Sequence, residues 1–135
     1  MSPGGAVYVD PLVYAGHTSI PADETVAYPG ILVIEPRRHI PGPEDLTDQE
    51  AMSIGLQIAR LSRALKACTD AEHVYIFRLG HHVPHLHVFL VPRYPGTPRQ
   101  YWGVHVDEWP DGPRANAQEI EALCTKLRSF LQDQV

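Results

Sequence analysis

The segment from His85 to Val91 alternates between two kinds of side chain, and it restricts the possible folds more than any other part of the sequence. Successive side chains of a β-strand point to opposite faces of a sheet. One face of such a strand would carry only aliphatic side chains, those of Leu86, Val88 and Leu90. The other face would carry His85, His87, Phe89 and Val91. The pattern predicts a strand whose aliphatic face lies under a helix, with two histidines about 7 Å apart on the opposite face.

Two helices are expected, and each is marked by a capping box at its start. Thr47 precedes Glu50 by three positions, and Asn116 precedes Glu119 by the same interval. At this spacing the two side chains can each satisfy a free N–H of the first turn. Apolar residues then recur every three or four positions, which predicts amphipathic helices over residues 47–67 and 116–132.

The remaining β-type runs complete the predicted fold. They lie at residues 6–9, 12–14, 31–34 and 73–77, in addition to the strand at 85–91. Strands, a helix, further strands and a second helix follow one another along the chain. This order predicts an α+β fold with an antiparallel sheet, built as a single domain over residues 1–135.

The overall composition argues against several classes of protein. The 135 residues carry a formal charge of −5, with 11 Lys and Arg against 16 Asp and Glu, so we expect no binding to long nucleic acids. No apolar stretch approaches the roughly 18 residues of a membrane span. The first residues do not resemble a secretory signal, so we expect no membrane partner and a cytoplasmic location. Cys68 and Cys124 form no Cys-x-x-Cys motif and are expected in the core.

Histidine is the unusual residue of this chain, because four of its eight histidines lie between positions 81 and 87. Neutral imidazole is both a nucleophile and a metal ligand near neutral pH. Histidines on the open side of a sheet can equally face solvent without a chemical role. The cluster therefore marks the place to examine and leaves its chemistry open.

The residues around the cluster resemble the signature of the histidine triad family. That signature is His-φ-His-φ-His-φ-φ, where φ is hydrophobic, commonly with Gly-Gln-x-Val-Pro-His before it and Pro-Arg after it. The chain reads Gly80-His81-His82-Val83-Pro84-His85-Leu86-His87-Val88-Phe89-Leu90-Val91-Pro92-Arg93. The segment from Pro29 to His39 similarly resembles the family's Pro-Gly-His-hydrophobic-Pro-Lys-x-His segment. The similarity extends from about Val7 to Arg99 and looks like an actinobacterial type of the family.

The resemblance implies a fold, an assembly and a reaction. It implies the α+β histidine triad unit, with about five antiparallel strands and two helices, and a homodimer in which two sheets join into one. It also implies hydrolysis or transfer at a nucleoside 5′-phosphate without a cofactor, with phosphoramidates and dinucleoside polyphosphates as candidate substrates. His87, the middle triad position, would attack the phosphate and carry a nucleotidyl group, and His85 would help to orient it. Arg93, at the end of the histidine strand, is a candidate for a phosphate contact and equally for a surface ion pair.

The chain departs from the family pattern at several site positions. Phe89 stands at the third histidine of the triad, and Ile31 stands at the histidine that follows Pro-Gly. His17 aligns with the acidic residue that usually binds the ribose, and His81 replaces the glutamine before the triad. Phe89 can neither donate a proton nor bind a phosphate oxygen. His81 or His82 is then the candidate to supply the missing donor, and both join the expected substrate-binding residues.

Two alternatives remain open from the sequence. His85 and His87 have the spacing of two metal ligands from one strand, and a third could come from His39, His81, His82 or His105. Such a cluster would make the protein a metal-dependent enzyme. The other alternative is a nucleotide-binding module with weak or absent catalysis, which follows from the apolar residues Ile31 and Phe89.

Overall fold

The computed structural model describes residues 3–78 and 84–133 of the chain. Five strands form one antiparallel sheet in the order β1-β2-β4-β6-β5. They are β1 (Ala6–Val9), β2 (Val13–His17), β4 (Leu32–Pro36), β5 (His73–Phe77) and β6 (Val88–Arg93). Two further strands, β3 (Val26–Ala27) and β7 (Ala115–Asn116), pair in a small second sheet that the sequence did not predict. The predicted α+β fold with an antiparallel five-stranded sheet is confirmed.

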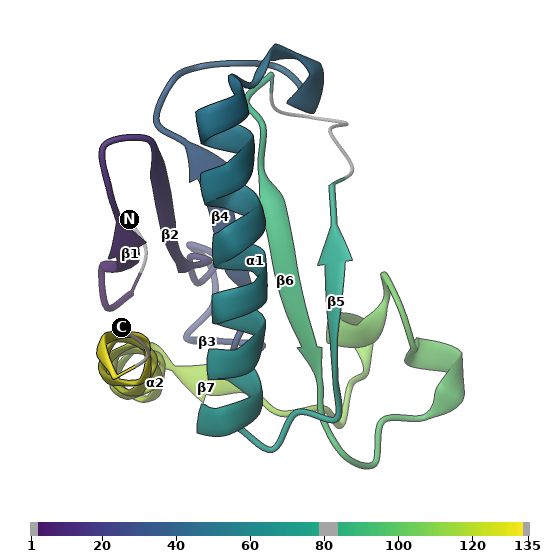
Figure 1. The fold of residues 1–135 in the computed structure, drawn as a ribbon. Coiled ribbons are helices and arrows are strands. Elements are labelled where there is room, and N and C mark those ends of the chain that lie inside the picture. Colours follow the sequence, from purple (N-terminus) through teal and green to yellow (C-terminus); the bar gives the residue numbers. More distant parts are fainter. Residues whose placement is uncertain (1–2, 79–83, 134–135) are drawn as a thin grey trace.

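Both predicted helices are present, and both begin at their predicted caps. They are α1 (Asp48–Cys68) and α2 (Ala117–Gln132), and the short 3₁₀ turns are η1 (Pro43–Asp45), η2 (Arg99–Tyr101) and η3 (Val106–Glu108). The Thr47 and Asn116 side chains each accept a hydrogen bond from the third helical N–H, and the acidic residue at that position bonds back to the cap. Each cap stabilises its helix by about 1 kcal/mol. Figure 1 shows α1 running along the strands, while α2 is seen end-on beside it.

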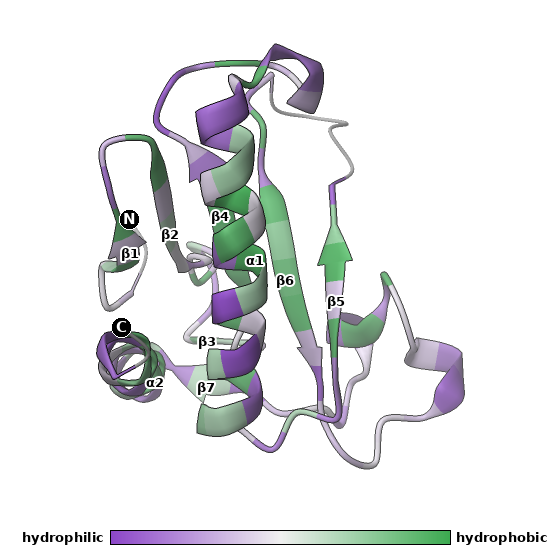
Figure 2. Cartoon of the chain, in the orientation of Figure 1, coloured by the Kyte–Doolittle hydropathy of each residue, from purple (hydrophilic) through white to green (hydrophobic). Residues whose placement is uncertain are grey.

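One face of the sheet packs against the helices and forms the main core. Directly opposed residues of antiparallel strands share a face, and the register pairs Leu32 with Leu90 and Ile34 with Val88. Leu32, Ile34 and Leu90 are fully buried, and they pack in one cluster with Leu61 of α1. Burial of each such aliphatic side chain contributes about 1.5–3 kcal/mol. The hydrophobic character of β6 along most of its length is visible in Figure 2.

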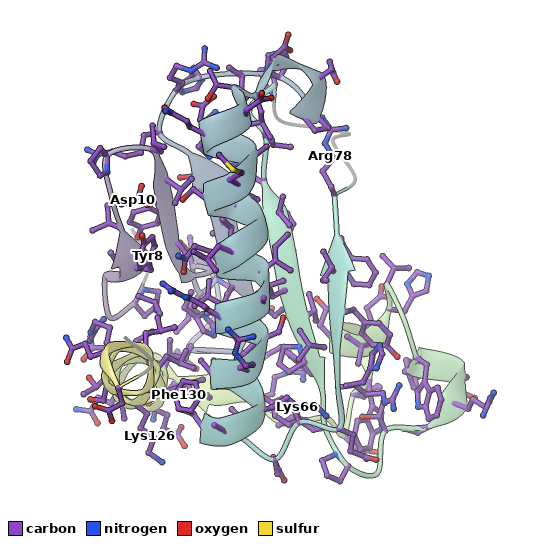
Figure 3. All side chains as sticks on the ribbon, in the orientation of Figure 1. Tyr8, Asp10, Lys66, Arg78, Lys126 and Phe130 are labelled. Atoms are coloured by element: carbon purple, nitrogen blue, oxygen red, sulfur yellow. The ribbon has the colours of Figure 1, made fainter. Side chains whose placement is uncertain are left out.

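Polar side chains tie the ends of these elements together. The carboxylate of Asp10 accepts hydrogen bonds from the backbone N–H groups of Leu12 and Val13, which closes the turn between β1 and β2. It also accepts from the hydroxyls of Tyr8 and Ser53, so the turn is linked to β1 and to α1. The side chains of Tyr8 and Asp10 lie next to each other in Figure 3.

The first turn of α1 is held by a buried carboxylate. Glu50 is only 2% exposed, and the Arg38 guanidinium donates to both of its carboxylate oxygens, at 2.8 and 2.9 Å. Glu50 also accepts the N–H of Thr47 as the second half of the capping box. The segment after β4 is thereby fastened to the start of α1.

The opposite face of the sheet carries a second, smaller cluster. Tyr28, Val91, Tyr94 and Val106 are buried in it, and partly buried aromatic and aliphatic side chains pack around them. Those side chains are Ile31, Tyr75, Phe77 and Phe89. Val106 belongs to η3, so the segment that follows β6 folds back over part of this face. An apolar region therefore covers one part of the face, and the other part is left for polar groups.

The strand that carries the histidine motif begins later than predicted. β6 starts at Val88, and a bend at Pro84 and His85 leads into it. The N–H of Leu86 donates to the Ile40 carbonyl at 2.8 Å and is therefore not paired with β4. Pro36, which ends β4, has no N–H to offer a partner strand. Leu86 is nevertheless buried at 2% exposure, so the prediction that it faces the core is confirmed.

Two further properties follow from the described residues. Cys124 is fully buried, as predicted, while Cys68 is partly exposed. Within residues 3–78 and 84–133, neither helix is both long and apolar enough to cross a membrane.

Candidate active site

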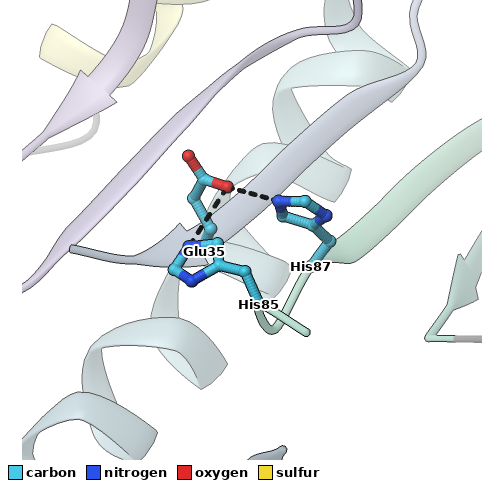
Figure 4. Close-up of side chains that lie close together, drawn as sticks. All are labelled: Glu35, His85 and His87. Atoms are coloured by element: carbon cyan, nitrogen blue, oxygen red, sulfur yellow. Dashed lines mark ion pairs between the residues drawn. The ribbon is translucent and has the colours of Figure 1, made fainter. Parts of the chain in front are cut away.

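The polar part of the open face holds a group of three side chains, Glu35, His85 and His87. The register pairs Val33 with Phe89 and Ile34 with Val88, so its continuation places Glu35 beside His87. Oε2 of Glu35 lies 2.7 Å from Nε2 of His87 and 3.5 Å from Nε2 of His85. Figure 4 shows both imidazoles directed at this one carboxylate oxygen. The structure thus brings together the two predicted histidines and adds a carboxylate.

The two histidines differ in their surroundings. The side chain of His85 is 10% exposed, whereas those of Glu35 and His87 are each 27% exposed. Burial lowers the pKa of His85 below its ordinary value, and the Glu35 carboxylate opposes this shift only in part. The ring of His85 lies between those of His39 and His87, at centroid distances of 4.4 and 5.2 Å. Burial therefore favours the neutral form of the His85 ring, and His87 is the imidazole more accessible to a substrate.

The contact between Glu35 and His87 fixes the orientation of the more exposed ring. A carboxylate oxygen only accepts hydrogen bonds, so Nε2 of His87 is the donor across the 2.7 Å contact. A charge-assisted bond of this kind is about twice as strong as one between neutral groups. Glu35 is thereby placed to hold a proton or to receive one beside His87, which are the two tasks of a general acid or base.

The two apolar departures from the triad pattern lie in the same region of the molecule. Phe89 follows His87 along the open face, with ring centroids 6.0 Å apart. Phe89 and Ile31 both pack against the apolar cluster around Val91 and Val106. A histidine at either position would place a polar ring against this cluster. Apolar residues at 31 and 89 therefore suit this cluster, and Phe89 also borders the polar group through its contact with His87.

His17 lies on the other side of the sheet from His87. The register sets it opposite Leu32, so it faces the helices, and it is fully buried. Its Nε2 accepts the N–H of Gly30 and its Nδ1 donates to the Thr18 carbonyl, both at 2.8 Å. Burial lowers the pKa of His17, which favours the neutral ring that these bonds require. The structure thus places His17 as a brace for the Pro-Gly turn, away from the histidine cluster.

Arg93 is also separated from His87. It lies at the far end of β6, six residues on, which corresponds to about 20 Å along a strand. Its guanidinium lies 3.7 Å from the centroid of the Trp102 ring and donates to the hydroxyl of Tyr75 at 2.8 Å. These contacts hold the segment after β6 against the sheet, and the structure does not bring Arg93 to the polar group.

The other candidate histidines are distributed as follows. His81 and His82 lie outside the described residues, so the structure gives no position for them. His39 is exposed and its ring contacts that of His85. His105 is exposed at the N-cap of η3 and pairs with Glu108, apart from the cluster. Among the described residues, the third polar member of the site is therefore Glu35 rather than another histidine.

Glu35 was not predicted from the sequence, although one signal was available. It is the first charged residue after the apolar run from Ile31 to Ile34, within a strand that is otherwise hydrophobic. A charge there must lie on the open face because the alternate residues Leu32 and Ile34 are buried. Its pairing with His87 depends on the register between β4 and β6, which the sequence alone does not reveal.

Comparison with known proteins agrees with this architecture. The family model described as the HIT domain matches residues 2–96. No curated protein shows significant sequence similarity to the chain. The fold and the motif together define a histidine triad architecture, and the chain belongs to the HIT domain family.

Several solved structures share the fold. A hypothetical histidine triad nucleotide-binding protein from Sulfolobus tokodaii has a TM-score of 0.71 at 17% identity, covering 96% of this chain and 85% of that one. A histidine triad protein from Bradyrhizobium japonicum has a TM-score of 0.68 at 26% identity, with coverage of 93% and 89%. The diadenosine triphosphate hydrolase of Plasmodium falciparum, solved with cyclomarin A, has a TM-score of 0.68 at 13% identity, with coverage of 99% and 80%.

Proposed function

We propose that the protein is a nucleotide hydrolase or transferase that acts at a nucleoside 5′-phosphate through a nucleotidyl group on His87. The observation that carries this proposal is the accessible His87 imidazole, oriented by Glu35 and packed beside the buried His85. Membership of the HIT domain family supports the substrate class. One neighbour in fold is a diadenosine triphosphate hydrolase, and the same class of phosphoanhydride is a candidate substrate here, together with phosphoramidates.

The proposed reaction uses only side chains of this chain and water. A nitrogen of His87 attacks the α-phosphorus, a P–N bond forms, and the bond from phosphorus to the leaving group breaks. Nε2 cannot both attack and donate to Glu35, so attack by Nε2 requires this hydrogen bond to open and the ring proton to move to Nδ1 by exchange with water. The leaving group departs as a phosphate anion, or as an amine that takes its proton from water. Water then attacks phosphorus, the P–N bond breaks, and a nucleoside monophosphate leaves. The Glu35 carboxylate, beside the same imidazole, accepts the proton of that water.

Glu35 compensates in this proposal for the missing third histidine of the triad. Phe89 offers no proton and no hydrogen bond. Glu35 reaches His87 from the neighbouring strand β4 instead of from β6. His81 and His82 remain proposed contacts to the leaving group, and Ile31 and Phe89 would border the bound phosphate ester.

The test compares wild type with His87→Ala on adenosine and guanosine phosphoramidates and dinucleoside polyphosphates. We expect wild type to gain the mass of one nucleotidyl group and to release the monophosphate, and His87→Ala to lose both. His73→Ala, which removes an exposed imidazole on β5, should keep both. Monophosphate release by His87→Ala at the wild-type rate would overturn the proposal.

A second candidate function is favoured by the apolar positions. Ile31 and Phe89 both pack against an apolar cluster, which suits a site that binds a nucleotide without rapid turnover. The same experiment separates the two functions. Nucleotide binding by wild type without an adduct or a product would indicate a binding module.

The proposed assembly is a homodimer joined along β5. This strand is at one edge of the sheet, so its outer backbone groups have no strand beside them within the described chain. Such an edge is a template for pairing with a second strand. Ile76, on this strand, is 52% exposed, and burial of this aliphatic side chain in an interface would favour association. Pairing of two β5 strands would cover the edge and join the two sheets.

A further inference from the structure

We propose that Glu35, His85 and His87 form a binding site for a divalent transition-metal ion of the zinc type. The three side chains come from two strand regions that are distant in sequence, and each offers one donor atom to a common point. Their donor atoms all lie within 4.8 Å of one another. This set of two imidazoles and one carboxylate is not the three-histidine set considered from the sequence.

Two of the three distances between donor atoms can be compared directly with those around a bound ion. Zinc lies about 2.0–2.1 Å from imidazole nitrogen and 2.0–2.2 Å from carboxylate oxygen, so tetrahedral ligands lie about 3.3–3.5 Å apart. The 3.5 Å between Glu35 and His85 already matches this spacing. The 2.7 Å contact between Glu35 and His87 would have to lengthen by roughly 0.7 Å. The partly exposed side chains of both residues can make this adjustment by small rotations.

The donor set also selects the kind of ion. Imidazole suits zinc, copper, iron and nickel, whereas magnesium and calcium prefer a shell of oxygen atoms. Two histidines and one carboxylate supply three ligands, and a fourth position is left for water or a substrate oxygen. The side chains of Glu35 and His87 are each 27% exposed, so water or a substrate can reach this side of the site. A zinc-type ion is therefore the occupant that the chemistry of the site favours.

Occupation by the ion would alter the reaction proposed above. This step rests on the proposed function, because it assumes that Nε2 of His87 attacks phosphorus. The same nitrogen lone pair cannot bind an ion and attack at the same time. Zinc should consequently prevent nucleotidylation of His87 and act as an inhibitor of turnover.

Calorimetric titration with Zn²⁺, together with native mass spectrometry, tests the site on the full chain after chelator treatment. We expect one ion per wild-type chain. Glu35→Gln should bind it at least about tenfold more weakly, since loss of even an outer-shell partner weakens a metal site by 10–100-fold. Glu108→Gln is the matched control, because Glu108 lies beside the single imidazole of His105, and it should bind Zn²⁺ as wild type does.

A double variant separates this ligand set from one that uses His81 or His82. A chain with both His81→Ala and His82→Ala should keep its zinc affinity, and loss of binding in that chain would overturn the proposed ligand set. Unchanged affinity in Glu35→Gln, or absence of a one-to-one complex in wild type, would also overturn it. Far-ultraviolet circular dichroism checks that each variant is folded. None of these measurements needs a nucleotide, so their results test the metal site independently of whether the proposed reaction takes place.

Discussion

At the scale of single residues, the pair of Glu35 and His87 leads to a prediction about the order of the chemical steps. In Glu35→Gln the side chain keeps its shape but can no longer accept a proton from water. Attack by His87 should continue while hydrolysis of the nucleotidyl group slows. We expect turnover to fall by about 10²–10⁴-fold, the usual contribution of a positioned acid or base. Intact-mass analysis during turnover should show the adduct accumulating on the variant and not on wild type.

The control for this prediction is again Glu108→Gln, which should turn over substrate like wild type. Wild-type turnover by Glu35→Gln would show that the carboxylate does not take part in hydrolysis. Lost turnover without an adduct would place Glu35 in the first step instead of the second. The accumulation of the adduct, rather than the loss of rate, is therefore the decisive observation.

At the scale of secondary-structure elements, the start of α1 should control the acid sensitivity of the fold. The Arg38 guanidinium holds the pKa of the Glu50 carboxyl at about 2, well below its ordinary value of 4.5. A carboxyl with a lowered pKa stabilises the folded state above its unfolded pKa, and this contribution is lost as the pH falls. We expect the melting temperature of wild type to fall most steeply between about pH 4.5 and pH 2 for this reason.

Arg38→Gln should lower the melting temperature at pH 7, because it leaves a buried carboxylate without its ionic partner. It should also flatten the decline between pH 4.5 and pH 2, since less stabilisation remains to be lost. Arg63→Gln changes an exposed arginine of α1 that is not paired with Glu50, and it should leave the pH profile of the melting temperature unaltered. Melting curves over this pH range, followed by circular dichroism, measure the effect. Parallel profiles for wild type and Arg38→Gln would contradict it.

The elements themselves were predictable to different degrees. The helix starts at Thr47 and Asn116 follow from local capping chemistry, and both were confirmed. The strand of His73–Phe77 also agrees with its prediction. The start of β6 was wrong by three residues, because Leu86 bonds to Ile40 across the fold and no local pattern records that contact. Glu35 was missed for the same reason, since its place beside His87 depends on how two distant strands are paired.

The site shows a similar division between local and long-range information. His85 and His87 were predicted to share one face of a strand, and their rings lie next to each other in the structure. His17 matched a family position by alignment, but strand register turns it toward the helices. An alternation pattern reveals which residues of one strand share a face. It does not reveal which residues of another strand lie beside them.

At the scale of the whole molecule, the proposed dimer can be tested at the two edges of the sheet. β5 and β1 are the outermost strands, and each carries one aliphatic residue that is 52% exposed, Ile76 and Val9. A lysine on an edge strand opposes pairing with another chain. If β5 forms the interface, Ile76→Lys should dissociate the dimer while Val9→Lys leaves it intact.

Light scattering coupled to size-exclusion chromatography gives the mass directly. Wild type and Val9→Lys should show twice the chain mass of 15.1 kDa, and Ile76→Lys should show the chain mass itself at the same concentration. A wild type with the mass of a single chain would exclude the homodimer. If only Val9→Lys has the mass of a single chain, the interface lies at β1 instead. Because β5 pairs directly with β6, dissociation should also test whether the site depends on assembly. Retained nucleotidylation in monomeric Ile76→Lys would show that Glu35, His85 and His87 of one chain suffice for the first chemical step.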